Sequence, residues 1–183
     1  PLMMTADSAG PAANSMEHLR NIELACAKNW QQLLSERQRR ITAFTEGLGY
    51  HLRAGLHRDQ RLPAIDAYDE GRCNEVLDTL GGTIQVPTLR LNTNTHLKHF
   101  QREDWDTAVT NLPTDTQKSW RANIQIMGQM PPADPTFAQW SLFLVERLLA
   151  RGVPIGAGTD TPIGLPYPAT ACTPNWSYWW KAV

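Results

Sequence analysis

This sequence contains two short runs that predict strands, and at the end of each stands a side chain that could do chemistry. These side chains are His18 and Asp160. Asp160 ends the run Gly-Val-Pro-Ile-Gly-Ala-Gly-Thr-Asp, whose small residues leave no bulk beside the backbone. This run predicts a strand that passes through a crowded place and presents Asp160 at its carboxyl end, where parallel α/β sheets hold their functional groups. An imidazole and a carboxylate brought together there would suit a divalent metal, zinc above all.

Each of the two residues also has a structural interpretation. His18 would then be an ordinary surface or core histidine, and Asp160 a helix N-cap or turn residue. The glycines at 156 and 158 also suggest a dinucleotide-binding loop and hence an oxidoreductase. That interpretation is disfavoured because Thr161 stands where the third glycine is required, and no helix-like apolar run follows it.

Other residues carry weaker signals. Arg90 and His96 follow the β-branched run at 83–86 and are the candidates for contact with a substrate. His51 and His57 belong to a basic stretch that predicts a solvated loop. The three cysteines are far apart and form no Cys-x-x-Cys pair, so we expect inert thiols, which are compatible with a reducing, cytoplasmic compartment.

The elements that would position these residues follow from hydrophobic periodicity and from turn residues. Strands are predicted at 14–19, 83–86 and 152–160. Helices are predicted at 21–44, 65–80, 103–110 and 114–127, and from the Asp134-Pro135 start to Gly152. Helices between strands imply parallel crossovers, so the order predicts an α/β sheet.

Composition limits the function classes. The 183 residues are 42% hydrophobic and 19% charged, which is ordinary for one globular domain or part of one. The 17 basic and 18 acidic side chains are well mixed, so neither nucleic acid nor a membrane surface is expected as a partner. A small-molecule substrate is therefore the partner that we expect.

Three motifs resemble, in this order, the later strands of the amidohydrolase superfamily, closest to its imidazolonepropionase-like and Xaa-Pro-dipeptidase-like branch. They are Asn-Ser-Met-Glu-His-Leu at 14–19, Val-Pro-Thr-Leu at 86–89 and the run at 152–160. The resemblance implies a partial TIM (β/α)8 barrel that covers about strands six to eight. It also implies that His18 and Asp160 bind zinc, that Asp160 takes a proton from the attacking water, and that the reaction is hydrolysis of an amide, cyclic amide or dipeptide bond.

The family's metal ligands on earlier strands have no counterpart here, so we expect residues 1–167 to be a barrel fragment with little or no activity by itself. The rival interpretation is a noncatalytic α/β interaction module in which His18 and Asp160 are structural. Residues 168–183 form an aberrant tail that holds three of the seven tryptophans. One set of codons for this tail encodes an acidic, leucine-rich helix in a shifted frame, so we expect the tail to be out of frame.

Overall fold

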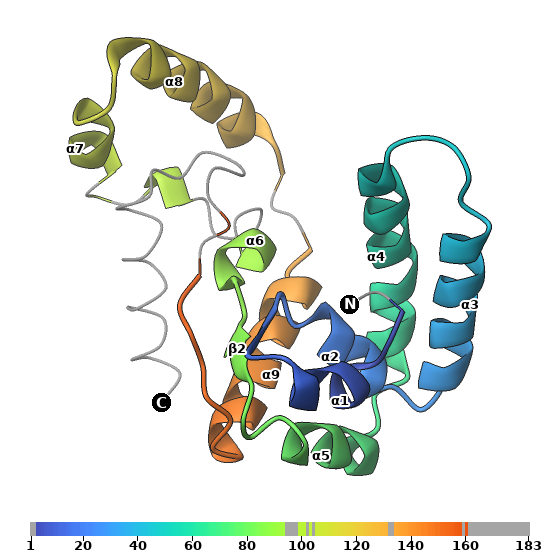
Figure 1. Cartoon of the computed structure of the whole chain (residues 1–183). Coiled ribbons are helices and arrows are strands. Elements are labelled where there is room, and N and C mark those ends of the chain that lie inside the picture. The colour runs from blue at the N-terminus through green and yellow to red at the C-terminus, as the bar shows by residue number, and fades with distance from the viewer. Residues whose placement is uncertain are drawn as a thin grey trace. The chain divides into compact units, whose positions relative to one another are not determined.

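The computed structural model describes residues 3–93, 99–101, 103, 105–131, 134–158 and 160, and within them the chain is mostly helical (Figure 1). It divides into two compact units. The first comprises Pro1–Pro87 and Leu144–Gly156, and the second comprises Thr88–Phe143 and Ala157–Val183.

The first unit contains a small parallel sheet. Strand β1 (Ser15–Glu17) pairs in parallel with β2 (Ile84–Val86), so that Met16 lies opposite Gln85. A parallel bridge joins Gln85 to Ile155 on the other side of β2. The places and the parallel direction of the first two predicted strands are therefore confirmed, whereas the third is reduced to a bridge.

Gly156 explains why this third segment is built from small residues. Its N–H donates to the Gln85 carbonyl at 2.8 Å. A Cβ at this position would lie 3.0 Å from Ile84 Cγ2 and 3.2 Å from Val86 Cγ2, tighter than most real Cβ contacts. The predicted crowding beside the strand is confirmed at this glycine.

The prediction of an α/β fold in the form of a partial TIM (β/α)8 barrel is wrong for the described part of the chain. Its strands form one two-stranded sheet, and helices account for most of the remainder. The physical reason lies in the strand residues. Strands of a parallel barrel are buried on both faces, whereas Ser15, Glu17 and Ile84 are exposed.

The predicted helix at 21–44 is interrupted. Before the sheet's first strand lie α1 (Ala6–Ala9) and the 3₁₀ turn η1 (Gly10–Ala12), and after it come α2 (Arg20–Ala25) and α3 (Trp30–Thr42). Between α2 and α3, the Lys28 N–H donates to the Ala67 carbonyl at 2.7 Å, and the Asp69 N–H donates to the Cys26 carbonyl at 2.9 Å. These bonds to a distant segment replace helical bonds, which explains the break.

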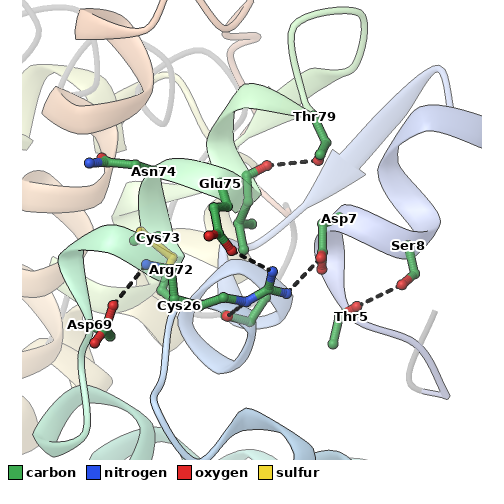
Figure 2. Close-up of polar contacts among 12 residues, drawn as sticks. Thr5, Asp7, Ser8, Cys26, Asp69, Arg72, Cys73, Asn74, Glu75 and Thr79 are labelled. Carbon is green, nitrogen blue, oxygen red and sulfur yellow. Dashed lines mark hydrogen bonds and ion pairs between the residues drawn. A yellow bond between two sulfur atoms is a disulfide. The ribbon is translucent and has the colours of Figure 1, made fainter.

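The expectation of inert thiols is wrong for two of the three cysteines. Cys26 and Cys73 form a disulfide with an S–S distance of 2.16 Å, which ties the end of α2 to α5 (Glu70–Asp78). Figure 2 shows Arg72 beside this disulfide. Its guanidinium donates to Asp7 at 2.6 Å and to the Ala25 carbonyl at 3.2 Å, so it joins α1 and α2 to α5.

The predicted basic loop is helical. Helix α4 (Gly49–Asp66) contains it and lies beside α3 (Figure 1), and Pro63 stands inside the helix. Its buried face carries Leu56, Gln60 and Ala64 at four-residue spacing. Because a polar glutamine stands in the middle of that face, the apolar periodicity of α4 is weak in the sequence.

Helix α9 (Thr136–Ala150) has residues in both units. Asp134 opens it as predicted, since its carboxylate accepts the Thr136 N–H at 2.7 Å. Leu144 and Leu148 are fully buried. Other fully buried apolar residues of the first unit include Ala25, Cys26, Leu56, Cys73, Val76, Leu77 and Leu80.

The second unit contains α6 (Leu89–Thr93), η2 (His99–Gln101), α7 (Trp105–Thr110) and α8 (Thr114–Gln129). Trp105 stacks on Trp120 with ring centroids 5.7 Å apart, in a cluster with Val109. The helices predicted at 103–110 and 114–127 are confirmed with small changes of boundary. Residues 161–183, which include the tail, lie outside the described residues. None of the described helices combines the length and apolar character of a membrane span.

Candidate functional site

Unusual backbone marks the residues that follow the strand segments. Among the described residues, the non-glycine residues with positive φ are His18 (65°), Leu19 (35°), Thr88 (49°) and Asp160 (51°). His18 follows β1 directly, Thr88 comes two residues after β2, and Asp160 comes five residues after Ile155. Left-handed φ is sterically costly for a leucine and for a β-branched threonine, and such strain concentrates at functional sites.

His18 is held by the sheet at the start of this strained turn. Its N–H donates to the Val86 carbonyl at 2.9 Å, and its own carbonyl accepts the Arg20 N–H. His18 lines a pocket of about 310 Å³ in the first unit. The volume lies within the usual range of small-molecule sites.

The pocket at His18 is built by β1, the start of α2 and one face of α4. Its wall is formed by Ser15, Met16, Glu17, His18, Arg20, Asn21, Arg53 and His57. Arg53 and His57 are four residues apart on α4, so they lie on the same helix face. The basic stretch, expected as a solvated loop, therefore contributes two side chains to the wall.

His57 is a neutral histidine among arginines. Burial, followed by the charges of Arg20, Arg37, Arg53 and Arg61, lowers the pKa of His57 to about 3. Arg20 Nη1 lies 2.5 Å from His57 Nδ1. A guanidinium only donates, so Nδ1 must accept and the ring proton must be on Nε2.

A buried polar network lies behind the pocket. Glu23 accepts two hydrogen bonds from Arg61, at 2.8 Å from Nε and 2.6 Å from Nη2. Arg37 donates to Gln60 at 2.8 Å and to Asn21 at 2.9 Å. Burial lowers the pKa of Arg37 to about 10, and the charge of Glu23 opposes that shift.

Asp160 and Arg90 belong to the second unit. Asp160 is exposed, whereas Arg90 is buried near the start of α6. Burial lowers the pKa of Arg90, and the negative charge of Asp160 acts in the opposite direction. The structure thus brings these two predicted residues into electrostatic contact.

The other two predicted site residues are His18, which the structure describes, and His96, which it does not. His18 is in the first unit, beside Arg20, Arg53 and His57, which the sequence interpretation did not include in a site. The signal that could have found two of them is the four-residue spacing of Arg53 and His57 within the basic stretch. His96 lies outside the described residues.

No group of three or more histidine, cysteine, aspartate or glutamate side chains in the described ranges is arranged to hold a metal ion. Comparison of the chain with protein-family models, with curated proteins and with solved structures finds no match.

Proposed function

We propose that His18 and Asp160 are two ligands of a divalent metal, zinc, in a hydrolase of amide or cyclic amide bonds, as the three motifs that resemble the amidohydrolase superfamily imply. The observation that carries this proposal is the backbone strain. The backbone of both His18 and Asp160 has a positive φ, which costs about 1–3 kcal/mol for each residue. Both side chains can bind a metal, and each residue comes after a strand segment.

The donor types suit the metal, although they do not complete a site. Zinc accepts an imidazole nitrogen and a carboxylate oxygen, and a catalytic zinc takes three protein ligands. Since the described residues hold no group of three, the proposal requires at least one ligand beyond them. Because the metal ligands of the family's earlier strands have no counterpart in this sequence, we expect this chain alone to show little turnover.

The chain's own residues have distinct roles in this proposal. A bound cation would supply a lowered water pKa and a polarised substrate carbonyl. Asp160, which is exposed, would accept the proton of the attacking water and return it to the leaving nitrogen. His18 would hold the metal, beside a pocket large enough for a small substrate. Arg90 and His96 are the proposed substrate contacts.

Zinc titration of the full chain by calorimetry tests the metal site. We expect binding near one equivalent, weakened about tenfold or more by His18→Ala and by Asp160→Ala, because even the loss of an outer-shell partner costs about tenfold or more. The exposed residues His51 and Asp115 supply the matched controls His51→Ala and Asp115→Ala, which should bind zinc normally.

Two outcomes would contradict the proposal. Zinc binding that is unchanged in both His18→Ala and Asp160→Ala would remove these residues from the site. An absence of stoichiometric zinc would favour a noncatalytic interaction module in which His18 and Asp160 are structural.

A further inference from the structure

The pocket beside β1 has an excess of positive charge. Arg20 and Arg53 stand in its wall. Arg37 and Arg61 line a smaller adjoining cavity, which shares Arg20 and His57 with the pocket. Two arginines therefore line the pocket itself, and two more line the adjoining cavity.

Carboxylates offset only part of this charge. Glu17 is in the pocket wall, and Glu23 is in the adjoining cavity, where it is bound to Arg61 by two hydrogen bonds. Two carboxylates thus face four guanidinium groups. Burial is the largest cause of the low pKa of His57, and the four arginine charges lower it further, which agrees with a positive potential.

Three side chains of the wall, Arg20, Asn21 and His57, are held by hydrogen bonds. Arg20 is held by its bond to His57 Nδ1, which leaves the proton of His57 on Nε2. Asn21 is held by Arg37, and Arg37 by Gln60. This network holds the Arg20 side chain in place before a ligand arrives, which lowers the entropic cost of ordering it on binding.

We propose that this pocket binds the oxyanion group of a small ligand, a carboxylate or a phosphate, through the guanidinium groups of Arg20 and Arg53. A planar guanidinium matches both groups with paired, charge-assisted hydrogen bonds. The oxyanion would also neutralise the excess positive charge of the pocket. The pocket is the one that the proposed hydrolase would use for its substrate, but oxyanion binding through Arg20 and Arg53 requires neither Asp160 nor a metal. A test without zinc therefore separates the failure of this proposal from the failure of the proposed hydrolase.

Anion titration of the full chain in the presence of a chelator tests this inference. Succinate, inorganic phosphate and the uncharged analogue succinamide are compared by NMR at constant ionic strength near neutral pH. We expect at least one anion to bind and succinamide not to bind. Tighter binding of succinate identifies a carboxylate site, and tighter binding of phosphate identifies a phosphate site.

Two arginines of α4 give a matched pair of variants. Arg53→Gln changes an exposed residue of the wall and should weaken anion binding about tenfold through the loss of a charge-assisted hydrogen bond. Arg58→Gln changes an exposed arginine of the same helix that pairs with Asp59 and should leave binding unchanged. Circular dichroism of both variants verifies the fold.

The inference is overturned if neither anion binds or if succinamide binds as tightly as the anions. It is equally overturned if Arg53→Gln binds like the wild type, or if Arg58→Gln weakens binding as much as Arg53→Gln does.

Discussion

Glu23 is the residue on which the charge balance of the buried network depends. It is 2% exposed, it forms both hydrogen bonds of a buried ion pair with Arg61, and its charge acts on Arg37. Removal of one partner of a buried ion pair leaves an uncompensated charge away from water.

Glu23→Gln should therefore lower the free energy of unfolding by about 3 kcal/mol or more. Urea denaturation at neutral pH measures it. The matched control is Glu36→Gln, which removes a carboxylate from an exposed pair with Arg39. Exposed pairs contribute little, so the control should unfold near the wild-type midpoint. If Glu23→Gln and Glu36→Gln lose the same free energy of unfolding, burial does not make the Glu23–Arg61 pair more important than an exposed pair.

His57 makes stability depend on pH. Its folded-state pKa is about 3, below its usual value of 6.5, so the unfolded chain binds the proton more readily between these values. The stabilisation from neutral His57 is thus fully present above pH 6.5 and is lost as the pH falls toward 3.

His57→Gln should consequently lose less stability than the wild type between about pH 7 and pH 4, because glutamine accepts the Arg20 hydrogen bond without a titrating group. Urea unfolding at the two pH values gives the difference. His51→Gln, at an exposed position of α4, should follow the wild type. If the free energy of unfolding of His57→Gln falls with pH as steeply as that of the wild type, other groups cause the pH dependence.

Helix α9 shows a clear contrast between a buried and an exposed face. Leu148 is fully buried, whereas its neighbour Leu149 is 39% exposed. Both are leucines in the last turn of the same helix, so their helix propensities cancel in a comparison.

Leu148→Ala should destabilise the protein by about 2–5 kcal/mol, because it removes buried methyl groups and leaves a cavity. Leu149→Ala should cost far less. Thermal or urea unfolding of the two variants provides the comparison, and similar losses at the two positions would mean that this face of α9 is not the packed one.

The element predictions succeeded where local pattern decides the structure. Helix α9 has a clear apolar stripe and an aspartate cap, and it was found nearly to the residue. Helix α4 was missed because Gln60 and Arg61 occupy its buried face. Their burial is stabilised by Leu33, Arg37 and Glu23, partners that lie 23 to 38 residues away. A local window of sequence does not contain those partners.

At the scale of the whole molecule, the Cys26–Cys73 disulfide restricts the conformations of the unfolded chain as well as linking α2 to α5 in the folded protein. It closes a loop across a sequence separation of 47 residues. In the chain-entropy model, a loop of that length contributes about 4 kcal/mol to stability.

Reduction with dithiothreitol should therefore lower the free energy of unfolding of the wild type by about 4 kcal/mol. The double variant Cys26→Ala/Cys73→Ala should be insensitive to the reductant, whereas Cys172→Ala should keep the full response. Urea unfolding with and without reductant measures each effect. A wild-type protein indifferent to dithiothreitol would contradict the contribution of the disulfide.

The sequence by itself determined the places of β1 and β2 and of the helices α7 to α9, whereas the chemical roles of His18 and Asp160 stay a prediction. These features depend on side-chain periodicity, turn residues and caps, which are local. Only the tertiary structure decided that the strands stop at a two-stranded sheet, that a disulfide and distant backbone bonds interrupt the helix at 21–44, and that arginines of three helices surround His57. Each of these depends on partners far apart in the chain, which meet only when the helices pack.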